Sequence, residues 1–198
     1  MKLILDWDGT VTVRDSQWLL LDRFGDRAVW RAAEEGLGRT LSYRELMETE
    51  MATITVPLEQ AVAYLLEAVE VRRGFAELAS RYDPLVLSSG FVETIEPILA
   101  REGVEVDVVA NRLDPRPDGW RVRWNDDAPC PECGDLCKRR SLPDGGPLVY
   151  VGDGYSDRCA ALAADRVFAR RALAEYLDEQ RIPYEPFETF DDVAAALT

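Results

Sequence analysis

The 198-residue sequence contains no histidine. That absence excludes Ser-His-Asp and Cys-His nucleophilic sites, histidine-ligated zinc hydrolases and phosphohistidine chemistry. Lysine is almost absent as well, because Lys2 and Lys138 are the only two. Any catalysis must therefore depend on carboxylates, hydroxyls, thiols or one of these two amines.

Long apolar runs are also missing from the sequence. No stretch approaches the ~18 residues that a membrane helix needs, and Asp6 and Asp8 interrupt the apolar run at the amino terminus before a signal peptide could form. A cytoplasmic location, without a membrane partner, is the expectation. The 47% hydrophobic and 30% charged content predicts a globular chain with one sizeable core and room for a small inserted domain.

Positive charge is scarce relative to negative charge. The chain has 23 lysine and arginine residues against 37 aspartate and glutamate residues, which gives a formal net charge of −14. This balance argues against nucleic acid or an anionic membrane as the main partner. An anionic substrate would need local positive charge, from a metal ion or from a few basic side chains.

The most informative stretch is the first dozen residues. The apolar run Leu3–Leu5 predicts a buried strand, and it ends abruptly in Asp6, Trp7 and Asp8. Because successive strand side chains point to opposite faces, the two aspartates share one side and Trp7 faces the other. Ligands bind beyond the carboxyl ends of strands in open parallel sheets, and carboxylates there are costly unless something uses them. We interpret the pair as functional rather than as a solvated turn.

The rest of the chain alternates between helical and strand patterns. Four short helices are predicted before the second strand, at 15–24, 26–35, 43–53 and 57–71, and such a block at the mouth of a sheet would form a lid. Further helices are predicted at 74–82, 91–102, 157–164, 172–180 and 191–197. Strands are predicted at 85–87, 104–109, 148–151 and 167–168, with a hairpin strand at 120–124. The predicted class is α/β, a parallel sheet in three layers, with a core at 1–12 and 73–198 and a helical cap at 13–72.

Three of the predicted strands end in polar clusters, which are Asp6/Asp8, Ser88/Ser89 and Asp153/Asp157. Parallel strands bring these clusters to one edge, where each close pair of carboxylates would cost ~4 kcal/mol at an effective dielectric constant near 20. A hard cation such as Mg²⁺ would stabilise them, since all the ligands are oxygens. The Ser88–Gly90 turn predicts an anion cradle at a helix start. Together with Lys138, these groups indicate phosphoryl transfer.

The four motifs, in this order and at strand ends, resemble the haloacid dehalogenase-like superfamily of phosphatases, which have a Rossmann-like core. The resemblance implies that Asp6 is the nucleophile that becomes a phospho-aspartate and that Asp8 is the general acid and base. It also implies that Ser88, Ser89, Gly90 and Lys138 bind phosphate. The Mg²⁺ ligands implied are Asp6, Asp8 (through its carbonyl), Asp153 and Asp157. Two alternatives stay open: Asp157 as a helix-capping residue, and Arg139 or Arg140 in place of Lys138.

Within this superfamily the helical insert resembles the phosphoserine phosphatase branch. Cap and tail segments are more similar still to the methionine-salvage phosphatases that act on a 2-hydroxy-3-keto-5-methylthiopentenyl phosphate. The expected partner is a small phosphorylated metabolite, and phosphoserine is disfavoured because Glu48 and Glu50 stand where that branch has a carboxylate-binding arginine. Three other functions stay open: a phosphoethanolamine or phosphocholine phosphatase, a phosphotransferase, and a binding module without catalytic activity. The oligomeric state, monomer or homodimer, also stays open. Asp15 is either a substrate contact or a helix N-cap.

The four cysteines form a motif that this chemistry does not use. Cys130-Pro-Glu-Cys133-Gly is typical of a zinc knuckle, with Cys137 four residues later. Cys159 or a carboxylate could be the fourth ligand of a structural Zn²⁺ if the fold brings it near. Reduced thiols or a disulfide are the alternatives. Cys133 and Arg139 also have the C-x5-R spacing of cysteine-dependent phosphatases, but the intervening residues make a poor phosphate loop.

Overall fold

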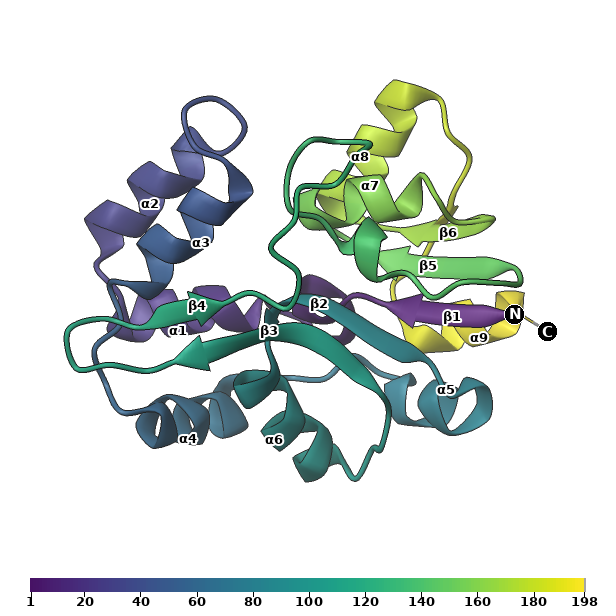
Figure 1. The fold of residues 1–198 in the computed structure, drawn as a ribbon. Helices are drawn as coiled ribbons and strands as arrows, with labels where there is room; N and C mark the ends of the chain where they lie inside the picture. Colours follow the sequence, from purple (N-terminus) through teal and green to yellow (C-terminus); the bar gives the residue numbers. More distant parts are fainter. Residues whose placement is uncertain (198) are drawn as a thin grey trace.

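The computed structural model describes residues 1–197, and within them seven strands form one sheet with helices on both faces (Figure 1). The strands are β1 (Lys2–Leu5), β2 (Leu85–Phe91), β3 (Val108–Asp114), β4 (Arg121–Arg123), β5 (Leu148–Gly152), β6 (Arg166–Ala169) and β7 (Glu185–Pro186). Their order across the sheet is β4-β3-β2-β1-β5-β6-β7. Neighbouring strands are parallel except for the antiparallel pair β3 and β4. The predicted α/β class with a mostly parallel sheet is confirmed.

The helices are α1 (Ser16–Phe24), α2 (Arg27–Gly36), α3 (Tyr43–Met51), α4 (Leu58–Ala68), α5 (Phe75–Tyr82), α6 (Val92–Glu102), α7 (Arg158–Ala161), α8 (Arg171–Gln180) and α9 (Phe190–Ala196). Short 3₁₀ turns occupy Lys138–Ser141 and Tyr155–Asp157. Among residues 1–197, no helix combines the length and the apolar character that crossing a membrane would require.

The alternating side chains of the central strands divide the core between the two faces of the sheet. Leu3 and Leu5 of β1 belong to one buried cluster, which extends to α5, α6 and α9. Ile4 points to the opposite face and packs in a second cluster, which includes Leu173 and Leu177 of α8. This split follows from the two-residue period of a strand. It places helices on both faces and leaves the carboxyl ends of β1, β2 and β5 uncovered by the crossover helices.

The segment between β1 and β2 supplies four helices with clear start signals. The Asp15 carboxylate accepts a hydrogen bond from the Trp18 N–H at 2.9 Å, and Ser42 and Glu45 form a capping box at the start of α3. Helices α2 and α3 pack against each other and stand apart from α4, which packs on α6 (Figure 1). The division into a cap at 13–72 and a core stays a prediction.

The structure corrects the predicted end of one strand and start of another, and it adds one strand that was not predicted. Strand β2 continues through Ser88–Gly90 because Phe91 still pairs with Asn111 of β3, so these residues lie in the strand rather than at a helix start. Strand β3 begins at Val108 instead of Val104, whose N–H donates to the Leu99 carbonyl and closes the end of α6. Strand β7 was not predicted because only two residues pair with β6.

Candidate active site

The residues after β1 form an irregular turn, Trp7–Val11, that presents Asp6 and Asp8 at one edge of the sheet. Asp6 is buried, and Asp8 is half-buried. Gly9 has a φ of +77°, and a Cβ there would lie 2.2 Å from Oδ2 of Asp153. Only glycine allows the turn to pass this close to the carboxylate that follows β5.

Arg72 fixes this turn through hydrogen bonds to its backbone carbonyls. Sequence reasoning did not single out this residue. Its guanidinium donates hydrogen bonds to the carbonyls of Thr10 at 2.7 Å, Gly9 at 2.8 Å and Thr12 at 3.2 Å, and a fourth to Glu188. Burial lowers the pKa of Arg72 to about 10, so it remains charged at neutral pH. The planar fork of an arginine suits this set of carbonyls, which a lysine could not bridge.

Lys138 reaches the same edge from the loop before β5. Its Nζ donates to Oδ1 of Asp6 and, at 2.6 Å, to Oδ1 of Asp157. All three side chains are buried. The neighbouring arginines face other partners, because Arg139 lies 3.9 Å from Glu132 and Arg140 lies 2.6 Å from Asp126. The structure therefore brings Lys138, and not the arginines, to the aspartates.

Asp157 is held by hydrogen bonds on both carboxylate oxygens. Oδ2 accepts from the backbone N–H groups of Asp153 and Gly154, both at 2.9 Å, while Oδ1 accepts from Lys138 and from the Tyr150 hydroxyl at 2.7 Å. The alternative that Asp157 caps the following helix was wrong, because its side chain makes no capping hydrogen bond to α7 and instead accepts from Gly154, before the 3₁₀ turn, and from Lys138. This arrangement leaves little room for Asp157 to bind an ion as well.

The carboxylates are close enough to hold a cation. One oxygen each of Asp6, Asp153 and Asp157 lies within 4.8 Å of the other two. Burial raises the pKa of Asp6 well above its usual value, and the charge of Asp157 adds to this rise. Burial and Asp157 also raise the pKa of Asp153 to about 6. An all-oxygen set of mutually repelling carboxylates fits a hard cation such as Mg²⁺.

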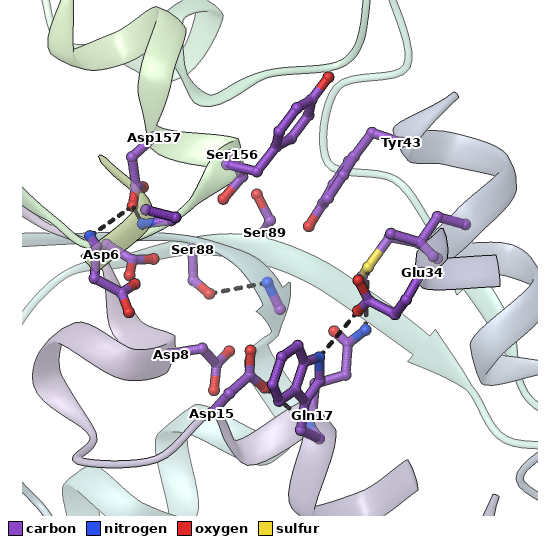
Figure 2. A pocket seen from close by; sticks show the side chains of 18 of the residues that line it. Asp6, Asp8, Asp15, Gln17, Glu34, Tyr43, Ser88, Ser89, Ser156 and Asp157 are labelled. Carbon is purple, nitrogen blue, oxygen red and sulfur yellow. Dashed lines mark hydrogen bonds between the residues drawn. The ribbon is translucent and has the colours of Figure 1, made fainter. Parts of the chain in front are cut away.

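Ser88, Ser89 and Gly90 lie beside these aspartates, near the end of β2, the strand that pairs with β1. The Ser88 hydroxyl accepts a hydrogen bond from the Gly90 N–H at 2.9 Å, and a Cβ on Gly90 would lie 2.9 Å from Oδ2 of Asp8. The Asn111 side chain donates to the Ser89 carbonyl at 2.8 Å and fixes the strand there. Figure 2 shows Ser88 and Ser89 on the same side of the cavity as Asp6 and Asp157.

Asp8 is fixed by the first turn of α1. Its Oδ1 accepts hydrogen bonds from the backbone N–H of Ser16 at 2.7 Å and from the Ser16 hydroxyl. Burial raises the pKa of Asp8, and the Ser16 bonds only partly oppose this rise. Asp15 caps α1 and also lines the cavity, so the two roles proposed for it from sequence are compatible.

The aspartates and the β2 residues Ser88, Ser89 and Gly90 form the floor of a cavity of about 700 Å³, a size typical of small-molecule sites. The helices α1, α2 and α3 supply its far wall, with Gln17, Trp18, Glu34, Tyr43, Leu46, Met47 and Glu50 (Figure 2). This wall mixes apolar groups with amide, hydroxyl and carboxyl groups. Sequence reasoning had no signal for most of these residues, because helical periodicity assigns them simply to a buried face.

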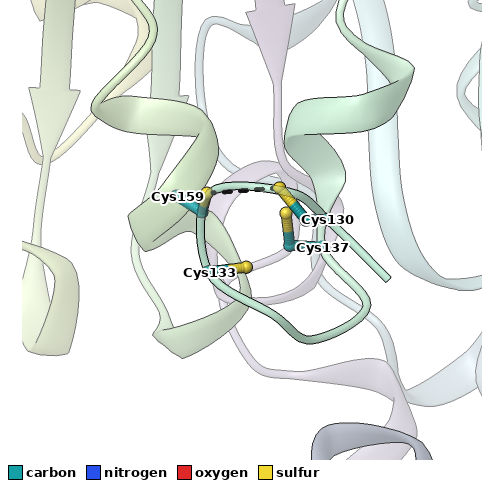
Figure 3. A group of neighbouring side chains, drawn as sticks. All are labelled: Cys130, Cys133, Cys137 and Cys159. Atoms are coloured by element: carbon teal, nitrogen blue, oxygen red, sulfur yellow. Dashed lines mark hydrogen bonds between the residues drawn. The ribbon is translucent and has the colours of Figure 1, made fainter. Parts of the chain in front are cut away.

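The four cysteines lie together outside this cavity (Figure 3). Cys130, Cys133 and Cys137 belong to the loop before Lys138, and Cys159 belongs to α7. Their sulfur atoms all lie within 4.8 Å of one another, and among the described residues no disulfide joins them. The sequence left the fourth ligand to Cys159 or a carboxylate, and the structure brings Cys159 close to the other three sulfurs. The identity of any bound metal stays a prediction.

Comparisons with known proteins agree with this geometry. A model of the family described as haloacid dehalogenase-like hydrolase matches residues 3–162. A 2-hydroxy-3-keto-5-methylthiopentenyl-1-phosphate phosphatase of Bacillus cereus (strain B4264) is 30% identical over 100% of this chain and 95% of its own length. Polyol phosphate phosphatase PYP1 of Saccharomyces cerevisiae is 30% identical over 98% of this chain and 91% of its length. A substrate-bound phosphoserine phosphatase has a similar fold, with a TM-score of 0.71 over 98% of this chain and 97% of its own, at 17% identity.

Proposed function

The chain belongs to the haloacid dehalogenase-like hydrolase family and is a phosphoric monoester hydrolase, and from that premise we propose that it uses Asp6 to release phosphate from a small phosphorylated metabolite. The observation that carries this proposal is the buried contact of Lys138 with both Asp6 and Asp157, two aspartates that line the cavity. A lysine in this position partly opposes the rise that burial causes in the pKa of Asp6 and supplies positive charge for an incoming phosphoryl group.

In the proposed mechanism, Asp6 attacks phosphorus and forms a phospho-aspartate while the substrate oxygen leaves. Asp8 donates the proton that the leaving oxygen needs, and then takes a proton from the water that hydrolyses the intermediate. Its raised pKa favours the protonated form that the first step requires. The Ser16 bonds hold Oδ1 of Asp8, which leaves Oδ2 turned toward Gly90 and the cavity.

The phosphoryl oxygens would contact Ser88, Ser89, the Gly90 backbone and Lys138. We propose that Asp6, Asp153 and the Asp8 carbonyl hold the Mg²⁺, with Asp157 acting through its hydrogen bonds to Lys138 and to the Asp153 backbone. When bound, the ion would offset the charge of the carboxylates and of the phosphoryl group. Burial, with the added repulsion of Asp157, raises the pKa values of Asp6 and Asp153, and a cation at this point would stabilise their ionised forms.

For the substrate we propose a methionine-salvage 2-hydroxy-3-keto-5-methylthiopentenyl phosphate, the compound named for the Bacillus relatives. Buried Leu46 and Met47 offer apolar surface for a methylthio group, and Gln17 and Tyr43 offer hydrogen bonds for its oxygens. The carboxyl groups of Asp15, Glu34 and Glu50 argue against a substrate that carries a carboxylate, such as phosphoserine.

A polyol phosphate is the second candidate substrate. The acidic far wall can accept hydrogen bonds from several hydroxyl groups, and the yeast relative at 30% identity is named a polyol phosphate phosphatase. The substitution Met47→Ala distinguishes the two candidates. It should raise KM for the methylthio compound and leave KM for a polyol phosphate nearly unchanged.

The test is phosphate release from an aryl phosphate and from both candidate substrates, with Mg²⁺ or with EDTA. Wild type should turn over only with Mg²⁺, and Asp6→Asn should lose at least about 10³-fold in kcat. The turnover of an alcohol acceptor in place of water would identify a phosphotransferase instead. Activity that survives in Asp6→Asn but disappears in Cys133→Ser would overturn the proposal in favour of a thiol nucleophile.

A further inference from the structure

We propose that Cys130, Cys133, Cys137 and Cys159 bind one structural zinc ion, and that this site fixes the loop that carries Lys138 against the helix that follows Asp157. Neither the family match nor the names of the relatives assigns a function to these cysteines. The argument rests on the geometry of the four sulfur atoms and on their position next to the phosphate-binding groups. The metal-binding part is independent of the proposed substrate.

The sulfur atoms have the spacing of a tetrahedral thiolate site. With Zn–S bonds of about 2.3 Å, tetrahedral geometry places the sulfurs about 3.8 Å apart. The Cys130 and Cys159 sulfurs are 3.9 Å apart, and all four lie within 4.8 Å of one another. A disulfide would require about 2.05 Å. Figure 3 shows the four side chains converging on a common centre from the loop and from α7.

The loop around Cys130 has the local structure of a metal knuckle. The Gly134 N–H donates to the Cys130 carbonyl at 2.8 Å, and the Cys130 N–H donates to the Asp135 carbonyl at 2.9 Å, so the chain reverses tightly between the first two cysteines. This reversal brings the sulfurs of the C-x2-C motif close together, at the spacing that zinc knuckles use.

Basic side chains surround the cluster. Four thiolates around Zn²⁺ carry a net charge of −2, which needs compensation when the site is partly buried. Arg139 and Arg158 line the same surface hollow as Cys133 and Cys159. Arg140 also interacts electrostatically with Cys130 and Cys137. In a chain with a net charge of −14, two arginines from the loop and one from α7 near the same thiols are a specific local arrangement.

The cluster connects the two segments that supply Lys138 and Asp157. Cys137 directly precedes Lys138, and Cys159 follows Asp157 by two residues. Between β4 and β5 the only regular structure within the described residues is the 3₁₀ turn Lys138–Ser141, which packs against α7 and β2. A zinc ion that joins the loop to α7 would hold Lys138 within hydrogen-bond distance of both aspartates.

The two metal sites would differ in chemistry. Soft thiolates select zinc and exclude Mg²⁺, whereas the carboxylates of Asp6 and Asp153 prefer Mg²⁺. Activity should therefore depend on two metals with separate roles, one required for each turnover and one for the position of Lys138. Saturating Mg²⁺ would not restore the function of a protein that has lost the zinc.

The first test is the metal content of the protein purified without chelator, measured by elemental mass spectrometry. We expect one zinc per chain in wild type and in Glu132→Gln, a control in the same loop, and at least a five-fold loss in Cys133→Ser and Cys137→Ser. Titration of metal-free wild type with Co²⁺ should give the intense visible absorption of a tetrahedral thiolate site, a readout that needs no folded variant. Substoichiometric zinc with four reactive thiols, or a disulfide found by mass spectrometry, would overturn the metal site.

The second test addresses Lys138. With saturating Mg²⁺ and an aryl phosphate, Cys133→Ser should lose at least ten-fold in kcat/KM, and proteases should cleave its loop between Asp126 and Leu136 faster than in wild type. Glu132→Gln should resemble wild type in both measurements. Loss of zinc with unchanged kinetics and unchanged cleavage would overturn the positioning role. A wild type that binds zinc but hydrolyses no phosphate would contradict the proposed function and leave the zinc site intact.

Discussion

Glu50 is a carboxyl group buried against the cavity, and its protonation should make stability depend on pH. Burial, with a further contribution from Glu34, raises its pKa from 4.5 to about 9, and Gln17 donates to one of its oxygens at 2.7 Å. Between these values the folded state binds more protons than the unfolded state, so the free energy of unfolding falls as the pH rises from about 5 to about 9. Glu50→Gln should remove this fall and raise Tm at pH 8.5 more than at pH 5.

The matched control is Glu67→Gln, which changes an exposed carboxyl group on α4. Its Tm should change little at either pH, because this side chain stays in contact with water in the folded protein. Differential scanning calorimetry across this pH range gives the measurement. Equal shifts of Tm for Glu50→Gln at pH 5 and pH 8.5 would mean that Glu50 is ionised in the folded protein.

Gly90 is the residue whose lack of a side chain allows Asp8 to approach β2. A Cβ there would lie 2.9 Å from Oδ2 of Asp8 and 3.1 Å from the Ser88 hydroxyl. Gly90→Ala should therefore displace Asp8 and lower kcat about 10- to 100-fold with a small effect on Tm, because misplacement by about 1 Å costs this much in rate. Steady-state kinetics with an aryl phosphate would measure it.

Gly103→Ala serves as the control, because it should lower stability without changing kcat, the reverse of what we expect for Gly90→Ala. Gly103 has a φ of +67° at the end of α6, and a Cβ there would meet no atom within 4 Å. The substitution should cost about 1 kcal/mol of stability through backbone strain and leave kcat unchanged. A Gly90→Ala enzyme with wild-type kcat would show that Asp8 does not need its observed position.

At the residue scale, the sequence predicted the catalytic floor better than the cavity wall. Asp6, Asp8 and Asp153 follow strands directly, so the rule that parallel strands end at one edge was enough to bring them together. Lys138 was expected there because it is the only lysine apart from Lys2 and because of the resemblance, since nothing local in its loop predicts its direction. Glu34 and Tyr43 gave no signal, because their contribution depends on how α2 and α3 pack.

At the scale of elements, Arg72 links the segment before α5 to the turn after β1. Arg72→Met would keep the bulk of the side chain but leave the carbonyls of Gly9, Thr10 and Thr12 without their donor. Since each buried unsatisfied group costs about 1–3 kcal/mol, the free energy of unfolding should fall by about 3 kcal/mol. The turn would also loosen, so kcat should fall as well.

The neighbouring Arg73 provides the control for that substitution. Its side chain is 81% exposed and pairs with Asp191 at 2.7 Å. Surface pairs of this kind contribute about 0–1 kcal/mol, so Arg73→Met should change stability little and leave kcat unchanged. Urea unfolding of the two variants measures the difference. Similar losses in both would indicate that Arg72 acts as an ordinary surface residue.

Helices were predicted more accurately than strand ends in this chain. Ser42 with Glu45, and Asp15 and Asp26 before apolar periodic runs, marked helix starts to within a residue. Strand ends depend on pairing with a distant partner, which no local pattern encodes. That is why β2 extends past Leu87 and why the two residues of β7 were missed.

At the scale of the whole molecule, negative charge surrounds an opening that must admit an anion. The carboxyl groups that line the cavity are Asp6, Asp8, Asp15, Asp22, Glu34, Glu50, Asp153 and Asp157, whereas its lining arginines are Arg14 and Arg171. The raised pKa of Glu50 removes its charge at neutral pH, but the chain as a whole carries a net charge of −14. A phosphate dianion therefore approaches against a repulsive field, and the attraction that we propose comes from Lys138, which contacts Asp6 and Asp157, and from the proposed cation.

Salt should accordingly speed capture of the substrate. The Debye length shrinks from about 20 Å to below 10 Å as monovalent salt rises from about 20 to 200 mM, so screening weakens the repulsion. At fixed saturating Mg²⁺, kcat/KM for an aryl phosphate should rise about two-fold over this range while kcat stays constant.

Asp22→Asn, at the cavity edge, should raise kcat/KM at low salt and reduce its salt dependence. Glu77→Gln removes the same charge from an exposed position on α5 and should have little effect. A fall of kcat/KM with salt would mean that the positive floor, and not the acidic wall, governs the approach.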